Sequence, residues 1–228
     1  MFPNTVFVTG TDTGVGKTAV SQALIEIYQQ ANLPVKAMKP ISSGAVQTAN
    51  GLRNPDAELL MKKTGQKDPY SLINPYVFEP PIAPHLAAAQ AGVEMNIDLL
   101  FDSFLQLKSE SNSMIIEGVG GWQVPITNTV SLADWVNQMQ WSVILVVGIK
   151  LGCINHARLT YSNMRQNETN LIGWVANQVS PSTKMSRDIV NDLQQYLSIP
   201  LLADIPYLSH DQDVDISPYF NLNKLNIN

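Results

Sequence analysis

The stretch GTDTGVGKT, residues 10–18, decides how this chain folds. It follows a run of apolar and β-branched residues, Thr5–Thr9, and leads into residues 17–31, where apolar side chains recur every three to four positions as on one face of a helix. Glycines at a strand-to-helix junction let backbone N–H groups turn inward around an anion, and the helix N-terminus adds its positive dipole end. Lys17 can reach outer phosphates, and the Thr18 hydroxyl can hold Mg²⁺. The stretch therefore predicts a phosphate loop.

The spacing within this loop departs from the general phosphate-loop pattern. Five residues separate Gly10 from Gly16, one more than the general pattern allows. The alternative interpretation is a glycine-rich turn in which Lys17 is incidental. The strand before the loop and the helix after it favour a phosphate loop.

Outward from the loop, short β-branched runs alternate with longer amphipathic stretches. That alternation is typical of parallel βαβ units, and near-continuous apolar runs suit strands that are covered on both faces. We therefore expect an α/β protein with a three-layer fold of the P-loop NTPase type, in which helices flank a mainly parallel sheet in a single domain over residues 1–228. The expected strands span Thr5–Thr9, Pro34–Met38, Met114–Glu117, Val143–Val147, Leu171–Ala176 and Leu201–Ile205.

The helices are predicted from their apolar period and from their end signals. Asn54, Pro55 and Asp56 supply an N-cap, a first-turn proline and a first-turn acid, and Gly65 closes that helix. The expected helices span Lys17–Ala31, 54–65, Pro84–Ala91, Ile97–Lys108, Leu132–Met139, Asn155–Arg165 and Met185–Leu197. The polar, asparagine-rich segment Ser209–Asn228 is expected to be a loosely held tail.

Composition and charge exclude several classes of function. The 19 acidic and 14 basic residues among 228 give a formal charge of -5, which leaves no basic face for a nucleic-acid backbone. A lone cysteine, Cys153, excludes an internal disulfide and any CxxC motif. The N-terminus lacks a signal segment, and the longest apolar run, Val143–Val147, is too short to span a bilayer. We therefore expect a cytoplasmic protein with no nucleic-acid or membrane partner.

Further charged residues stand at the ends of predicted strands. Lys39 and Ser43 come after the second strand, at the sheet edge where α/β proteins bind ligands. Glu117 ends the third strand and precedes a Gly-Val-Gly-Gly segment, whose backbone can approach a ligand closely. With Thr18 and Asp56, Glu117 supplies the oxygen ligands that Mg²⁺ prefers. Two alternatives stay open, since Lys39 would also suit a surface turn and Asp56 the positive end of a helix.

Weaker signals follow the fourth and fifth predicted strands. Asn177 could present its amide to a purine edge, although an asparagine in a turn is equally common. The segment Gly152–His156 starts a helix, which favours a second anion site. Cys153 is interpreted as a packing residue, because no base is assembled beside it in the sequence. The three histidines, His85, His156 and His210, are too scattered to predict a metal site.

Taken in order, these motifs resemble the dethiobiotin synthetase family, which uses ATP to close the ureido ring in biotin biosynthesis. The resemblance covers most of the chain, and the five-residue spacing in the loop is the one this family shows. It is carried by Val8–Thr13, Gly16–Thr18, Lys39-Pro40, Ser43-Gly44, Asp56, Glu117-Gly118, Gly120–Trp122, Leu151–His156, Asn177 and Ile205-Pro206. Gly14 departs from the family pattern, because many members carry an acidic residue there.

The resemblance implies a reaction and a set of residues. One amine of 7,8-diaminopelargonate would react with CO₂ to give a carbamate, which takes the γ-phosphoryl group of ATP before the second amine displaces phosphate. Lys17 and Lys39 are implied as catalytic residues, and Thr18, Asp56 and Glu117 as Mg²⁺ ligands. ATP binding is implied for Gly14, Val15, Gly16, Lys17, Thr18, Ala19, Asp56, Glu117, Asn177, Pro206, Tyr207 and Leu208. Substrate binding is implied for Thr13, Lys39, Ser43, Gly120, Gly152, Cys153, Ile154 and Asn155.

The resemblance also implies a homodimer with a shared active site. In this arrangement the helix start at Gly152–Asn155 of one subunit would hold the substrate's carboxylate tail beside the phosphate loop of the other. A helix N-terminus suits a carboxylate at the end of the substrate remote from the chemistry.

Other classes of protein remain as alternatives. A partitioning-type ATPase switch shares the loop, but that family carries a signature lysine five residues before the loop lysine, where this chain has Asp12. A small-molecule kinase would leave phosphate on its substrate, whereas ring closure releases inorganic phosphate. An ATP-dependent amidase would need a glutaminase domain, for which 228 residues leave little room.

Overall fold

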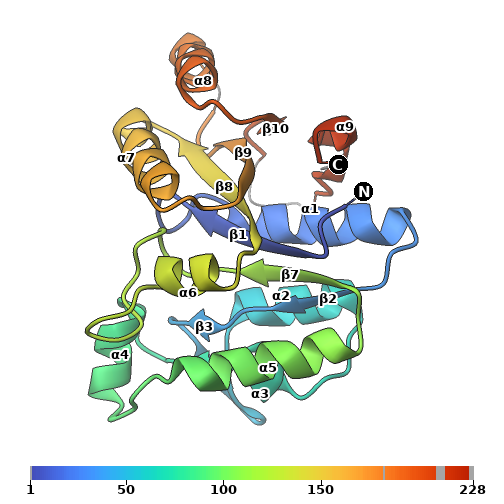
Figure 1. Ribbon diagram of the computed structural model, residues 1–228, viewed down its shortest axis with the longest axis vertical. Coiled ribbons are helices and arrows are strands. Elements are labelled where there is room, and N and C mark those ends of the chain that lie inside the picture. Colours follow the sequence, from blue (N-terminus) through green and yellow to red (C-terminus); the bar gives the residue numbers. More distant parts are fainter. Residues whose placement is uncertain (1, 182, 209–213, 226–228) are drawn as a thin grey trace.

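A parallel sheet forms the centre of the molecule (Figure 1). The computed structural model describes residues 2–181, 183–208 and 214–225. Within them the sheet has six strands in the order β10-β9-β8-β1-β7-β2, and every neighbouring pair is parallel. The strands are β1 (Thr5–Gly10), β2 (Val35–Met38), β7 (Ser113–Glu117), β8 (Ser142–Ile149), β9 (Leu171–Gln178) and β10 (Leu201–Ile205). All six predicted strands are confirmed, and β8 and β9 continue two residues farther than predicted.

Strand β1 occupies the middle of this sheet and positions the phosphate loop. Val8 lies beside Glu117 of β7 on one side and beside Ile144 of β8 on the other. Both faces of β1 are covered, since Val6, Phe7 and Val8 are buried, which explains its continuous apolar run. The carboxyl ends of these central strands therefore meet at one edge, where β1 leads into the loop and β7 ends at Glu117.

Helices cover both faces of the sheet and complete three layers (Figure 1). On one face, α1 (Lys17–Gln30) and α2 (Pro55–Thr64) pack against side chains such as Val6, Val8 and Ile144. On the other face lie α3 (Tyr70–Ile73), α4 (Pro84–Gln90), α5 (Ile97–Ser109), α6 (Leu132–Gln138), α7 (Cys153–Gln166) and α8 (Lys184–Tyr196). The predicted α/β class and three-layer architecture are confirmed.

Local signals set the helix boundaries well. Asn54 caps α2 by accepting hydrogen bonds from the N–H groups of Asp56 and Ala57, and Gly65 ends that helix with a φ of 69°. Helix α7 begins at Cys153, two residues before the predicted start at Asn155, because Gly152 at φ 89° already turns the chain into the helix.

Short strands beside the sheet edge were missed from the sequence. Strands β3 (Ile41–Ser42) and β6 (Tyr76–Val77) pair in parallel, and β4 (Val46–Thr48) with β5 (Gly51–Arg53) forms a hairpin. Two- and three-residue strands leave no readable apolar period. The Asn50-Gly51 pair was a usable hairpin signal.

The prediction of a loosely held tail is wrong for residues 214–225. Ile216, Phe220 and Leu225 are buried against the face that carries α1, and the Asn221 N–H donates to the Leu202 carbonyl at 2.8 Å. The segment forms the 3₁₀ turn η1 (Ser217–Tyr219) and α9 (Leu222–Leu225). Apolar residues spaced four to five positions apart within a polar stretch are enough to dock it. The rest of the predicted tail, 209–213 and 226–228, lies outside the described residues.

No helix in the described ranges is long and apolar enough to cross a membrane.

Candidate active site

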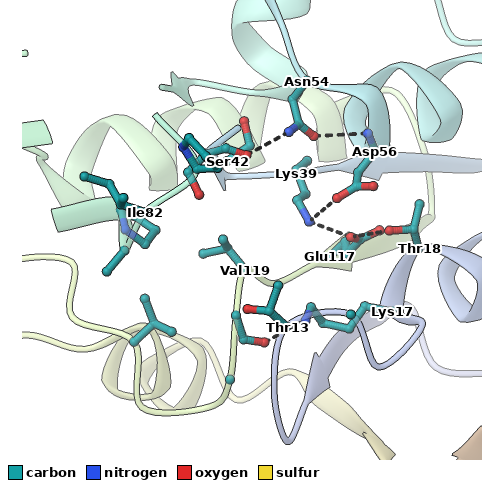
Figure 2. Close-up of a pocket in the computed structure, with 18 of the residues that line it drawn as sticks. Thr13, Lys17, Thr18, Lys39, Ser42, Asn54, Asp56, Ile82, Glu117 and Val119 are labelled. Carbon is teal, nitrogen blue, oxygen red and sulfur yellow. Dashed lines mark hydrogen bonds and ion pairs between the residues drawn. The ribbon is translucent and has the colours of Figure 1, made fainter. Parts of the chain in front are cut away.

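A cavity of about 890 Å³ opens at the carboxyl edge of the sheet, beside the phosphate loop (Figure 2). The loop supplies one wall, and the segments that follow β2 and β7 supply the others. The predicted site residues that line it are Thr13, Gly14, Gly16, Lys17, Thr18, Lys39, Ser43, Asp56, Glu117 and Gly120. Segments far apart in the sequence therefore converge where the parallel strands end.

The phosphate loop is held in shape by contacts beneath it. Gly14 and Gly16 have φ angles of 71° and 96°, a left-handed conformation that glycine adopts without strain. The Val15 side chain is buried, and the Val15 carbonyl accepts a hydrogen bond from Asn177 Nδ2 at 2.9 Å. A Cβ at Gly16 would collide with the Asn177 carboxamide, so the close approach requires glycine there. The loop is therefore preformed.

Lys17 lies across this loop and is 7% exposed. Its ammonium donates to the Asp12 carbonyl at 2.9 Å and to the Gly120 carbonyl at 2.6 Å. Burial, together with the positive charge of Lys39, lowers the pKa of Lys17 from 10.5 to about 8, and nearby carboxylates offset only part of that shift. A poorly compensated cation in this position suits an anionic ligand.

Lys39, unlike Lys17, is surrounded by carboxylates (Figure 2). Its ammonium lies 2.5 Å from Glu117 Oε1 and 3.3 Å from Asp56 Oδ2, and it donates to the Gly118 carbonyl at 3.0 Å. Burial acts to lower the pKa of Lys39, but the charges of Glu117 and Asp56 outweigh it and hold the pKa above its ordinary value. The alternative of a surface lysine is wrong, because Lys39 is 3% exposed.

Glu117 is the centre of the acidic side of the cavity and is fully buried. Thr18 Oγ1 donates to Glu117 Oε1 at 3.0 Å, which joins the start of α1 to the end of β7. The second oxygen, Oε2, is buried with no hydrogen-bond partner among the described residues. An unpartnered carboxylate oxygen beside a threonine hydroxyl and a second carboxylate, Asp56, fits a hard cation such as Mg²⁺.

Other predicted site residues lie outside this cavity. Gly152, Ile154 and Asn155 line a separate shallow depression with Arg158 and Tyr196. Cys153 is buried, and burial raises the pKa of its thiol, as expected for a packing residue. Ala19 and Pro206 line two further pockets. Leu208 packs against the buried side chains on the face of the sheet that carries α1.

Sequence reasoning missed several residues of the cavity wall. They are Ser42, Asn54, the loop after β6 at 81–84 and the segment at 123–125. Asn54 was recognised only as a helix cap. The prolines Pro81 and Pro84 were a usable signal for a rigid loop, but only the fold brings that loop over the cavity.

The loop position that distinguishes partitioning-type ATPases is engaged in an ion pair here. Asp12 Oδ2 lies 3.1 Å from Lys150 Nζ at the end of β8. The Lys150 ammonium and the Thr13 N–H lower the pKa of the Asp12 carboxyl. An anion in this position cannot replace the signature lysine.

The fold and this site together define a P-loop nucleoside-triphosphatase scaffold. Similar solved structures include a chain of the MinC:MinD cell division protein complex of Aquifex aeolicus, with a TM-score of 0.56 and 12% identity over 90% of this chain and 82% of that chain. The ParA family ATPase of Chlorobium tepidum TLS has a TM-score of 0.56 and 15% identity over 98% of both chains. At these identities the likeness shows the fold alone.

Sequence comparison identifies a family within this class of proteins. A family model described as an AAA domain matches residues 4–212. The ATP-dependent dethiobiotin synthetase BioD of Vibrio parahaemolyticus is 40% identical over 219 residues, which are 96% of both chains. The synthetases of the same name from Photobacterium profundum and Xanthomonas oryzae are 42% and 40% identical over 90% and 91% of this chain, and over 93% and 92% of their own. The chain belongs to the ATP-dependent dethiobiotin synthetase family.

Proposed function

We propose that this protein converts 7,8-diaminopelargonate, CO₂ and ATP into dethiobiotin, ADP and phosphate. Membership of the family supports the proposal. The observation that carries it is the meeting of Lys17 and Lys39 at one cavity with Asp56 and Glu117, because a phosphoryl group passing to an anionic acceptor needs positive charge on both partners.

The proposed chemistry has three steps. One amine of the diamine attacks CO₂ and loses a proton, which gives a carbamate. A carbamate oxygen then attacks the γ-phosphorus, the bond to the bridging oxygen breaks, and ADP leaves. Finally the second amine attacks the carbamoyl carbon and loses a proton, and phosphate leaves as the ring closes.

Different residues of the chain act on different groups in this reaction. Lys17 lies on the loop and neutralises charge on the β- and γ-phosphates, as a lysine in this position does in phosphate loops. Lys39, with Ser43 and Thr13, holds the carbamate against the γ-phosphoryl group. Both ammonium groups are buried, so their attraction to developing negative charge is little screened by water.

Thr18, Asp56 and Glu117 would hold Mg²⁺. The buried, unpartnered Oε2 of Glu117 supports this proposal. Among the described residues no group of three His, Cys, Asp or Glu side chains is close enough to bind a metal by itself. ATP phosphates would complete the ligand set. When bound, Mg²⁺ supplies charge neutralisation for the transferring phosphoryl group.

The adenine site is proposed at Asn177 and at Pro206, Tyr207 and Leu208, with Ala19 at the start of α1 beside the nucleotide. Asn177 Nδ2 donates to the Val15 carbonyl, so a base bound at Asn177 would lie beside the phosphate loop.

A homodimer completes the proposal. Leu151 and Leu159 are 84% and 63% exposed beside the depression formed by Gly152, Ile154 and Asn155, which suits a surface that a second copy covers. Lys17→Ala and Asn155→Asp variants, each nearly inactive, should recover about a quarter of wild-type activity when their subunits are exchanged, because about half of the dimers then contain one intact site. Activity that stays at the level of the separate variants after exchange, checked by native mass spectrometry, would rule out a shared site.

The reaction itself is tested by product analysis. Purified protein is incubated with diaminopelargonate, bicarbonate and MgATP, and the products are examined by mass spectrometry and phosphate assay. We expect a cyclic urea and equimolar phosphate, dependent on all three substrates. A phosphorylated diamine would identify a kinase, and ATP hydrolysis indifferent to the diamine would identify an ATPase switch.

A further inference from the structure

Asn74, at the end of α3, is a buried polar residue that does not line the active-site cavity. Its side-chain nitrogen donates to the carbonyls of Lys39 at 2.7 Å and Tyr76 at 3.1 Å. Its side-chain oxygen accepts from the hydroxyls of Ser42 at 2.7 Å and Tyr70 at 3.0 Å. Because carbonyl oxygens only accept, the amide nitrogen must face them, and the carboxamide's hydrogen-bonding capacity is then full. Asn74 is 1% exposed, so losing any of these bonds is costly.

Tyr70 connects Asn74 with the start of α2. Its hydroxyl accepts the Asn54 N–H at 2.8 Å while it donates to Asn74. The Asn54 side chain accepts from the Asp56 N–H at 3.1 Å (Figure 2) and from the Ala57 N–H at 3.3 Å. One connected path of hydrogen bonds therefore runs from Asn74 to the helix turn that carries Asp56.

We call this path the Asn74–Tyr70–Asn54 network. At one end it holds the backbone of Lys39, and Asn54 Nδ2 also donates to the Ser43 carbonyl at 3.3 Å. At the other end it holds the first turn of α2. The network therefore fixes two chain segments whose side chains meet at the cavity, where Lys39 Nζ lies 3.3 Å from Asp56 Oδ2. No hydrogen bond of the network involves the phosphate loop, residues 10–18.

We propose that Asn74 and Tyr70 are positioning residues that hold the Lys39 segment and the Asp56 turn in register with each other. The inference rests on the proposed function, in which Lys39 contacts the carbamate and Asp56 the metal ion. Breaking hydrogen bonds of the network would let Lys39 and Asp56 move apart without disturbing the phosphate loop, which binds the nucleotide. Metal affinity and turnover then fall together, and the KM for ATP does not change.

The test compares two tyrosines with the same substitution. Tyr70→Phe removes the hydroxyl of the network and keeps the ring on which the Arg53 guanidinium lies 4.1 Å from the centroid. Tyr76→Phe is the matched control, because it keeps the Tyr76 carbonyl that accepts from Asn74 and removes only a hydroxyl whose partners, the Asn96 N–H at 2.7 Å and the Asn96 carbonyl at 3.4 Å, lie outside the network. Each variant loses comparable hydrogen bonding, so a merely structural role would affect both alike.

The readouts are the kcat and KM for dethiobiotin formation and the affinity for Mn²⁺, measured by electron paramagnetic resonance in the presence of ADP. For Tyr70→Phe we expect kcat and Mn²⁺ affinity to fall by about fivefold or more, because the lost hydroxyl makes two hydrogen bonds, with the KM for ATP unchanged. Tyr76→Phe should match wild type in all three. Equal behaviour of the two variants, or a raised KM for ATP in Tyr70→Phe alone, overturns the proposal.

Asn74→Asp gives a second measurement. It replaces the amide nitrogen with an oxygen that faces two carbonyl oxygens, so we expect a larger loss than in Tyr70→Phe, in activity or in folded protein. Activity and Mn²⁺ affinity equal to wild type contradict the proposal. If wild-type protein forms no dethiobiotin, the proposed function fails, and the Mn²⁺ comparison between Tyr70→Phe and Tyr76→Phe still decides on the network.

Discussion

The phosphate loop and the acidic side of the cavity each present a buried lysine, but they are built in different ways. The loop is one continuous segment, and Lys17 is held there by the backbone carbonyls of Asp12 and Gly120. The acidic side draws Lys39, Asp56 and Glu117 from three separate segments, and Lys39 is held there by carboxylates. The pKa of Lys17 is lowered to about 8, whereas that of Lys39 is raised.

From this difference we infer different tasks for the two lysines. Lys17 has no carboxylate partner within hydrogen-bonding distance in the described structure, so its charge is available to a phosphate group that enters the loop. Lys39 is already neutralised by Glu117 and Asp56, so its charge becomes available when a cation binds those carboxylates. ATP binding should therefore depend on Lys17, and the reaction of the carbamate with ATP should depend on Lys39.

Replacing Lys17 should produce the largest effect. Lys17→Gln removes a preorganised charge from the transferring phosphoryl group, so kcat should fall on the order of a hundredfold or more. Steady-state assays of dethiobiotin formation measure this loss. Lys108→Gln, at the opposite edge of the sheet, is the control and should keep wild-type kcat. A Lys17→Gln kcat within about threefold of wild type would remove Lys17 from catalysis.

The next largest effect is expected at the acidic side. Glu117→Gln keeps the size of the side chain but removes its charge, so the Mg²⁺ concentration for half-maximal activity should rise by about tenfold to a hundredfold. Titration of activity with Mg²⁺ at saturating ATP measures the shift. If the titration is unchanged, Glu117 is only a structural partner of Lys39.

Nucleotide affinity separates the two lysines directly. Calorimetric titration with ATP should show binding weakened about tenfold in Lys17→Gln, the size of one charge-assisted hydrogen bond, and nearly unchanged in Lys39→Gln. Equal losses in both variants would mean that the two sides of the cavity act as one nucleotide site.

The smallest expected effect is a proton taken up on ATP binding. In the free protein the Lys17 pKa of about 8 lies below the ordinary 10.5, so Lys17 is mostly neutral at pH 8.5 and must gain a proton to pair with phosphate. Binding at pH 8.5 should take up about three quarters of a proton and weaken as the pH rises further. Calorimetry in two buffers of different ionisation enthalpy measures the uptake. Lys17→Gln should abolish this uptake, and an uptake of the same size in Lys17→Gln would show that another group titrates on binding.

The same contrast explains how much the sequence could predict. The loop was predicted down to single residues, because a strand, glycines, a lysine and a helix follow one another and their signals are local. Lys39, Asp56 and Glu117 were each proposed from strand or helix ends, but their mutual distances depend on the strand order, in which β7 lies between β1 and β2. The resemblance to a family supplied their joint role before geometry was known.

Other features of the structure could not be predicted from a single sequence. Asn74 carries no local pattern, and its connections appear only in the fold, where four polar groups, including those of Lys39 and Ser42 on a distant segment, surround its side chain. The docking of Phe220 was hidden because its apolar neighbours in the chain are sparse and its partners lie on β10 and α1.

One measurement tests directly whether a carbamate held by Lys39 attacks the phosphoryl group held by Lys17. C¹⁸O₂ is added to enzyme, diaminopelargonate and MgATP in unlabelled water, the reaction is stopped within one turnover, and the released phosphate is analysed by mass spectrometry. Attack by a carbamate oxygen predicts one ¹⁸O atom in each phosphate and one in the cyclic urea. Unlabelled phosphate, with the same amount of ATP consumed, would contradict the carbamate mechanism and with it the division of labour between the two lysines.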